Sequence, residues 1–172
     1  MKVGQRDRID HLVDRLAEMP AVEKVEPLAE GICDRISIIQ RRIMLRHKRS
    51  LDQHDITWRD WQVLTNLLLA GETPVSPSDL SSRLMVTTGA MTNVLDRLEQ
   101  RGLLRRVRNP ADRRSVIVEA TEAGSALWHV AVNELGEQEA QVVRTLAREE
   151  QEQLNALLRK LLAALPGDEG DS

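Results

Sequence analysis

Tyrosine and phenylalanine are absent from this 172-residue chain, which also has a single cysteine. No apolar run approaches the roughly 20 residues that a membrane-spanning helix needs. One cysteine excludes an internal disulfide framework, and no signal-type segment opens the chain. We therefore expect a cytoplasmic protein without membrane contact, whose core is built from aliphatic residues, methionine and three tryptophans.

The chain also lacks the local motifs of common enzymes. It has no glycine-rich phosphate loop, no nucleophile elbow, and no group of Glu and His at metal-ligand spacing. Its four histidines are scattered along the sequence: His11, His47, His54 and His129. We expect neither an enzyme nor a metal site, and no cofactor.

Charge is distributed unevenly along the chain. The net charge is −3, yet residues 97–114 carry seven arginines and two carboxylates, which gives +5. Residues 115–172 carry −7. A basic block in an acidic protein indicates a surface that meets phosphate, although a solvated helix end is the simpler alternative.

Amphipathic spacing predicts helices over most of the chain. The expected helices are residues 6–18, 28–52, 58–70, 77–84, 121–146 and 149–165, with one more from Thr87 that ends before Gly102. One apolar stripe follows the second helix, at Leu28, Ile32, Ile36, Ile39 and Ile43. The last helix carries leucines at similar spacing. One small lobe cannot cover both stripes, so they predict a homodimer.

The pattern changes to a strand period after Gly102. Residues 103–108 and 115–120 favour β-structure, and the turn-forming residues 109–114 separate them. Helix, short helix, tight turn, second helix and hairpin is the order of a winged helix-turn-helix. The expected fold is mainly α with a small β-hairpin wing.

Such a fold binds double-stranded DNA by placing its second helix in the major groove and its wing beside it. The candidate residues of this recognition helix are Thr87, Thr88, Gly89, Thr92, Asn93 and Arg97. The candidate residues of the wing are Arg105, Arg108, Asp112, Arg113 and Arg114. The alternative is that the Thr-Thr-Gly stretch is only a helix cap and that the arginines form a solvated turn.

Several motifs follow one another in a family-like order. They are Ser76-Pro77-Ser78-Asp79-Leu80, Thr88-Gly89-Ala90-Met91-Thr92-Asn93, Leu95-Asp96-Arg97-Leu98-Glu99, Gly102-Leu103, Asn109-Pro110-Ala111-Asp112-Arg113-Arg114 and Glu119-Ala120-Thr121-Glu122-Ala123-Gly124. In this order they resemble the MarR family of bacterial transcription regulators, and the resemblance covers roughly residues 28–165. It implies an obligate homodimer, formed by the N- and C-terminal helices, that binds a pseudopalindromic operator as a repressor. It also implies that Asp112 orients Arg114 in the minor groove, which leaves Arg113 for phosphate.

The resemblance further implies release from DNA by an unknown small-molecule effector, bound in a cleft beside the dimer helices. The candidate cleft residues are Arg41, Arg42, His47, Trp58, Trp61 and Trp128. Plain core packing of the tryptophans is the alternative. The N-terminal helix resembles the urate-responsive branch of the family. Its ligand residues are missing, since Gln62 and Val94 occupy two of the matching positions and no Trp precedes Trp58.

Two other functions remain open. Cys33 matches the position of the reactive cysteine in the family's organic-peroxide sensors, but their activating tyrosines are absent. Cys33 also lies on or beside the apolar stripe, where an apolar environment favours the neutral thiol. A winged-helix protein-interaction module is the third possibility, with the acidic C-terminal region as its contact surface.

These assignments divide the chain into five segments. They are an N-terminal helical extension (1–26), a dimerisation and ligand-cleft helix (27–56), a DNA-binding lobe (57–121), C-terminal dimerisation helices (122–166) and a tail (167–172).

Overall fold

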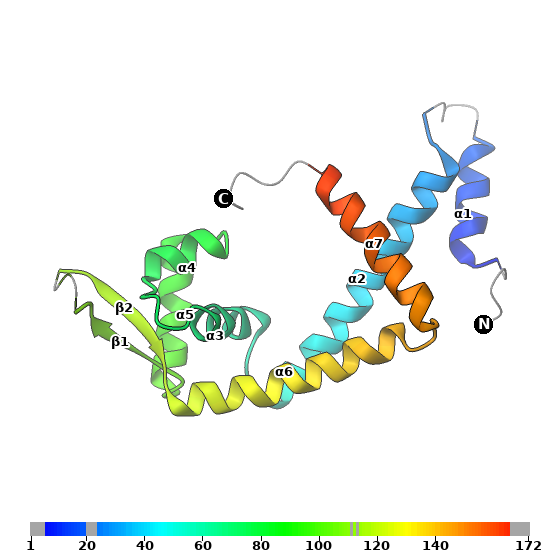
Figure 1. Ribbon diagram of the computed structural model, residues 1–172. Helices are drawn as coiled ribbons and strands as arrows, with labels where there is room; N and C mark the ends of the chain where they lie inside the picture. Colours follow the sequence, from blue (N-terminus) through cyan, green and yellow to red (C-terminus); the bar gives the residue numbers. More distant parts are fainter. Residues whose placement is uncertain (1–5, 20–23, 111, 113, 166–172) are drawn as a thin grey trace. The chain divides into compact units, whose positions relative to one another are not determined.

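A computed structural model describes residues 6–19, 24–110, 112 and 114–165 (Figure 1). The elements of this part are α1 (Arg8–Ala17), α2 (Pro27–Gln53), α3 (Trp58–Leu69), α4 (Pro77–Arg83), α5 (Thr88–Gln100), β1 (Leu104–Arg108), β2 (Val116–Ala120), α6 (Glu122–Val143) and α7 (Arg148–Ala164). The predicted fold class, mainly helical with one small hairpin, is confirmed. Among these helices none has both the length and the apolar character required to cross a membrane.

Local sequence signals set the helix ends. Thr57 begins α3 with a capping box, in which its hydroxyl accepts from the amide of Asp60 and the Asp60 carboxylate accepts from the amide of Thr57. Ser76 and Asp79 form the same box at the start of α4. Gly102 follows α5 with φ 68°, the left-handed conformation expected after a helix C-cap.

The chain forms two compact units, residues 1–46 and residues 47–172. The long helix α2 begins in the first unit and ends in the second. The five-segment division made from the sequence stays a prediction.

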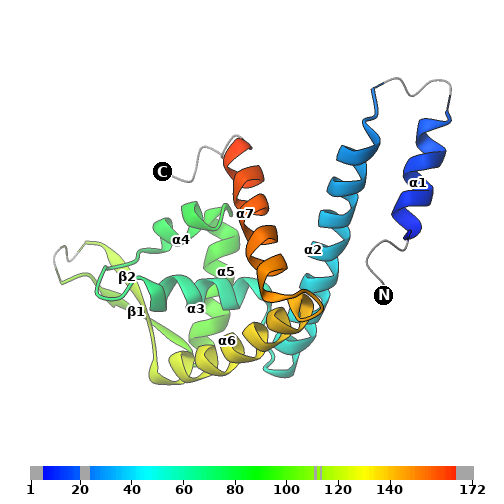
Figure 2. The same ribbon diagram turned by 45° about the vertical axis from the view of Figure 1, so that its right-hand side comes forward.

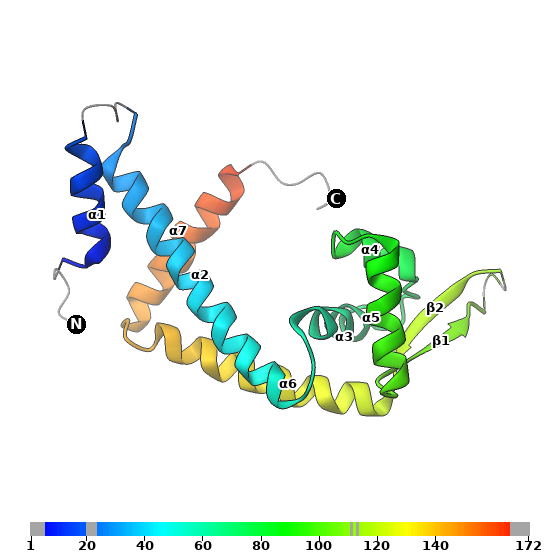
Figure 3. The same cartoon turned by 180° about the vertical axis from the view of Figure 1, so that it is seen from behind.

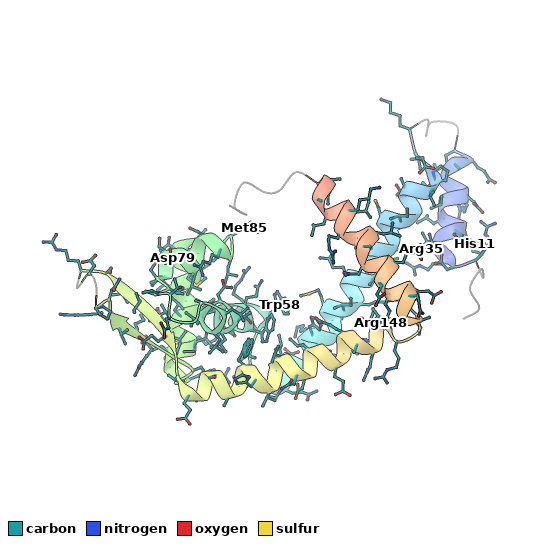
Figure 4. The ribbon with its side chains drawn as sticks, viewed as in Figure 1. His11, Arg35, Trp58, Asp79, Met85 and Arg148 are labelled. Carbon is teal, nitrogen blue, oxygen red and sulfur yellow. The ribbon has the colours of Figure 1, made fainter. Side chains whose placement is uncertain are left out.

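In the first unit, α1 is held on α2 by an apolar contact and an ionic fork. Ile9 and Val13 are buried on α1. The Arg35 guanidinium donates to Asp7 Oδ1 at 3.0 Å and to Asp10 Oδ1 at 2.7 Å. Figure 4 shows Arg35 reaching from α2 to α1. Asp7 is also the N-cap of α1, so one carboxylate both begins the helix and docks it.

The ionic fork makes α1 docking sensitive to acid. The hydrogen bond from Arg35 is the largest of the effects that lower the pKa of Asp7, from 3.8 to about 2. A carboxylate with a lowered pKa stabilises the folded state above its unfolded pKa and loses this effect as pH falls. We expect docking to be intact above about pH 4 and to weaken toward pH 2. In a titration of the Asp7 carboxyl carbon by NMR, Arg35→Met should raise the midpoint toward 3.8, whereas an unchanged midpoint would contradict the fork.

The second unit has one core, which lies among α3, α4, α5, α6 and the hairpin (Figure 2). Its fully buried side chains include Val63, Leu64, Leu80, Leu95 and Leu98. The strands β1 and β2 are antiparallel, with Leu104 opposite Ala120 and Arg108 opposite Val116. The hairpin is joined to the core because the Val118 amide donates to the carbonyl of Val75 at 2.8 Å.

Two apolar stripes stay uncovered in the described chain. The exposed residues of the α2 stripe are Leu28, Ile32, Ile36 and Ile39, and their exposed fractions run from 40% to 70%. Those on α7 are Leu154, Leu157, Leu158, Leu161 and Leu162. No residue of α7 is buried. Both stripes have the spacing predicted from the sequence, and these side chains are exposed in the described chain.

Candidate nucleic-acid interface

Four small polar residues and one glycine are exposed at or near the start of α5. They are Thr87, Thr88, Gly89, Thr92 and Asn93. Thr87 is the N-cap, and its hydroxyl accepts from the amide of Ala90 at 3.3 Å. The Asn93 side chain makes no hydrogen bond within the described residues, which leaves its amide free to pair with a base edge.

The opposite face of α5 is anchored in the core. Its buried residues are Met91, Val94, Leu95 and Leu98. The helix contacts α4 on one side and β1 on another, as Figure 3 shows from behind. This anchoring turns the polar face outward and places the hairpin beside it, the arrangement that a major-groove helix with a wing requires.

Asp112 shapes the tip of the hairpin. Its carboxylate accepts from the backbone amide of Arg114 at 3.0 Å, and its carbonyl accepts from the amide and hydroxyl of Ser115, each at 2.9 Å. The resemblance implied that Asp112 orients the Arg114 side chain. Within the described residues, the Asp112 carboxylate instead binds the backbone amide of Arg114. The Arg114 side chain is exposed. Arg113 lies outside the described residues.

The two other predicted wing arginines differ in their contacts. Arg105 pairs with Glu119, its cross-strand neighbour, at 2.7 Å, and its side chain is still 66% exposed. Arg108 is exposed at the end of β1, and in the described part of the chain it forms no ion pair. Both remain accessible to a phosphate backbone.

Arg97, predicted as a DNA contact, has a structural partner, and its side chain is still 44% exposed. Its guanidinium pairs with Asp60 of α3, whose side chain is 1% exposed. A buried carboxylate needs a counter-charge, and Arg97 supplies it. Arg97 therefore has a structural partner that the sequence did not indicate.

Arg106 is a wing residue that the sequence analysis missed. Its guanidinium lies 2.7 Å from Asp96 Oδ1 and 2.6 Å from Glu99 Oε2, and its amide also donates to Glu99 at 2.9 Å. Burial lowers the pKa of Arg106, but the bonds to these two carboxylates outweigh it, so the pKa is raised. Arg106 thus fixes the wing to α5. The only sequence signal for this contact is the spacing of Asp96 and Glu99 on one face of the helix.

A stack of three rings lies where α2 and α3 meet in the second unit. The ring centroids of His47 and Trp58 are 5.6 Å apart, and those of Trp58 and Trp61 are 4.9 Å apart. Trp58, the middle ring, is labelled in Figure 4. His47 is 4% exposed, and neither of its ring nitrogens has a hydrogen-bond partner among the described residues. Glu139 Oε1 lies 3.4 Å from His47 Nε2, an ion-pair distance without hydrogen-bond geometry.

More unpaired polar atoms are buried on the helices that carry or adjoin this stack. They are Trp61 Nε1, Gln62 Oε1 and Gln138 Oε1. Each such atom costs about 1–3 kcal/mol unless something supplies a partner. These unpaired atoms lie on α2, α3 and α6, near the rings of His47, Trp58 and Trp61.

Three of the predicted cleft residues do not belong to this ring stack. Trp128 donates to the Thr65 hydroxyl at 2.9 Å and thereby joins α6 to α3. Arg41 and Arg42 are exposed on the part of α2 that belongs to the first unit. The stack therefore retains His47, Trp58 and Trp61.

The structure also corrects the expected environment of Cys33, which is exposed rather than buried. Its neighbours Ile32 and Ile36 are 42% and 40% exposed, so the apolar stripe gives it no cover in the described chain. The nearby Arg35 guanidinium is occupied by Asp7 and the Gly31 carbonyl, among other acceptors.

We expect Cys33 not to act as a peroxide sensor, because Arg35, the cation nearest to it in sequence, is already occupied by Asp7 and the Gly31 carbonyl. Cys33→Ser should bind operator DNA as wild type does, and organic hydroperoxide should not release wild-type protein in a mobility-shift assay. Peroxide release of wild type alone, reversed by reductant, would overturn this expectation.

Comparison with known proteins agrees with this geometry. The model of the MarR family matches residues 54–115. The transcriptional regulator PecS of Dickeya dadantii is 32% identical over 145 residues, which cover 84% of this chain and 86% of PecS. The homoprotocatechuate degradative operon repressor of Escherichia coli is 26% identical over 142 residues, which cover 77% of this chain and 95% of that protein.

A solved structure of similar fold contains DNA. The MepR–DNA complex of S. aureus superimposes with a TM-score of 0.63 at 26% identity, covering 76% of this chain and 94% of MepR. The chain belongs to the MarR family, and it is a DNA-binding transcription regulator rather than an enzyme.

Proposed function

We propose that this chain is a cytoplasmic repressor that binds a pseudopalindromic operator as a homodimer and leaves it when a small molecule binds. The observation that carries the proposal is the exposed polar start of α5 beside a basic wing. Thr87, Thr88, Gly89, Thr92 and Asn93 would face the major groove, and Arg114 would enter the adjacent minor groove. Arg105, Arg108 and Arg113 would meet phosphate. The name of the E. coli relative, a repressor, supports the direction of regulation.

The uncovered stripes on α2 and α7 support the dimer. An obligate interface resembles a domain core cut in half, and rows of exposed isoleucine and leucine have that character. Sedimentation equilibrium at micromolar protein should give twice the chain mass of 19.4 kDa. A monomer at that concentration would contradict the assignment of these stripes.

The wing arginines should separate into two kinds of contact. Arg114→Ala should weaken operator binding by about 1–3 kcal/mol and random duplex much less, because it removes a guanidinium from the minor groove. Arg108→Ala is the matched control, since a lost phosphate contact weakens binding to all sequences alike. It also lowers the salt slope, which is the steepness with which log Kobs falls with log salt concentration, by about one. Equal losses on both duplexes for Arg114→Ala would show that Arg114 also contacts only phosphate.

The effector should bind at the stacked rings. We expect a flat molecule that stacks on these rings. Its polar groups would form hydrogen bonds with the unpaired ring nitrogens of His47 and Trp61. Binding should quench tryptophan fluorescence and release DNA, and Trp61→Leu should lose both effects while it still binds operator. Retention of both effects by this variant would place the effector elsewhere.

The proposed function is tested by selecting duplexes from a random pool with the wild-type protein. The proposal predicts enrichment of an inverted repeat, and its affinity should fall steeply with salt. No enrichment and weak binding would contradict a repressor and favour a winged-helix protein-interaction module.

A further inference from the structure

Residues 54–57 connect α2 to α3, and together with the first turn of α3, as far as Asp60, they are here called the corner. Asp55 has a left-handed backbone with φ 55°, and the amide of Ile56 donates to the Leu51 carbonyl at 3.2 Å. This bond closes α2 as a Schellman motif does. Leu51 and Ile56 are 1% and 2% exposed, so the start of the corner is anchored in the core. The corner therefore has one defined shape.

Two arginines at the C-terminal end of α5 bind the corner: Arg97 in its last turn, and Arg101 at its C-cap. Arg101 Nη2 donates to the His54 carbonyl at 3.1 Å, and its Nη1 donates to the Asp55 carbonyl. Arg97 pairs with Asp60. A hollow of about 330 Å³, lined by Asp60, Arg97 and Arg101 among others, lies beside these groups.

The corner is also bound from its other side by α6. Glu134 Oε2 accepts from the Ser50 hydroxyl at 2.6 Å and lies 3.0 Å from His54 Nε2. These hydrogen bonds, that of Ser50 first, lower the pKa of Glu134 and so favour its carboxylate form. His54 consequently contacts α6 through its side chain and α5 through its carbonyl.

We propose that Arg101 is a positioning residue for DNA recognition, and that Glu134 acts through His54 to set the corner on which Arg101 rests. A displaced corner changes the tilt of α5, and its exposed threonines and Asn93 then miss the base edges. Contacts with phosphate do not need this alignment, so specific affinity falls while general affinity does not. The inference rests on the proposed function, because it places α5 in the major groove.

The first test compares operator and scrambled duplexes for Arg101→Met, which keeps the side-chain length and removes the guanidinium. We expect operator affinity to fall about tenfold, with scrambled-duplex affinity and the salt slope unchanged. Arg101→Lys should give an intermediate loss, because an ammonium does not reproduce the two-pronged contact with both carbonyls. Equal losses on both duplexes, with a slope lower by about one, would make Arg101 a phosphate contact and overturn the proposal.

The second test measures the coupling between Glu134 and Arg101. Glu134→Ala should weaken operator binding several-fold, whereas Glu137→Ala, an exposed site on the same helix, should leave it unchanged. The double variant Glu134→Ala/Arg101→Met should lose less than the two single losses combined, because both act through His54. Fully additive losses would show that Glu134 does not act through the corner.

Thermal melting of each variant separates positioning from unfolding. If Arg101→Met fails to fold, Arg101→Lys and the comparison of Glu134→Ala with Glu137→Ala still test the proposal. A wild-type protein that does not distinguish operator from scrambled duplex would contradict the proposed function itself. A discriminating wild type with equally discriminating variants would contradict only this inference.

Discussion

Gly124→Ala should destabilise the second unit by about 3 kcal/mol or more, because a methyl group there has no space. A Cβ at this position would lie 1.9 Å from the carbonyl oxygen of Leu103 and 2.9 Å from its carbonyl carbon. That same oxygen accepts from the Thr121 amide at 3.1 Å, and the Thr121 hydroxyl donates to the Gly102 carbonyl at 2.7 Å. The substitution therefore forces apart the base of the wing and the start of α6.

Urea unfolding measures this loss, and Gly136→Ala on the same helix is the matched control. A Cβ at Gly136 meets nothing within 4 Å, so that change should be neutral or stabilising by about 0.5–1 kcal/mol. If Gly124→Ala is as stable as Gly136→Ala, the close approach of α6 to Leu103 is wrong.

Arg97→Met should cost about 3 kcal/mol of folding stability, since it leaves the buried Asp60 carboxylate without its counter-charge. This loss is at the lower end of the about 3–5 kcal/mol typical of a broken buried ion pair, because the Arg97 side chain is 44% exposed. The hydrogen bonds from Thr57 to Asp60, at 2.8 Å from both its amide and its hydroxyl, remain. Chemical denaturation should show the loss.

The double variant Arg97→Met/Asp60→Asn should recover part of that stability, because it removes the unpaired charge while keeping a side chain that accepts from Thr57. On folded protein, Arg97→Met should leave the salt slope of DNA binding unchanged. If log Kobs fell less steeply with log salt, by about one unit of slope, while stability stayed normal, Arg97 would be a DNA contact, as the sequence predicts.

Most of the fold was predictable because its boundaries are set by short-range chemistry. The hydroxyl of Thr57 and the carboxylate of Asp60 are three residues apart, and Gly102 needs only its own backbone freedom to follow α5. The hairpin was predictable for the same reason, since turn residues separate two β-favourable runs. Each of these signals involves residues only a few positions apart, within one helical turn or one β-hairpin turn.

Contacts between distant residues were not predictable in this way. Local spacing identifies Asp60 as a carboxylate of the first turn of α3, but its partner Arg97 is 37 positions away, and nothing local distinguishes Arg97 from a DNA-contacting arginine. Glu134 and His54, 80 positions apart, gave no signal at all. Exposure of Cys33 was missed because an apolar stripe on one helix does not reveal whether its own chain covers it.

The most direct test of the account is hydroxyl-radical footprinting of the wild-type protein on its selected operator. A dimer that places α5 in successive major grooves, with a wing beside each, should protect two symmetric patches centred about one helical turn apart. Arg114→Ala should remove the outer, minor-groove protection of each patch while the central protections remain. A single unsymmetric patch, or protection that extends uniformly along the duplex, would contradict a two-fold recognition complex built from α5 and the wing.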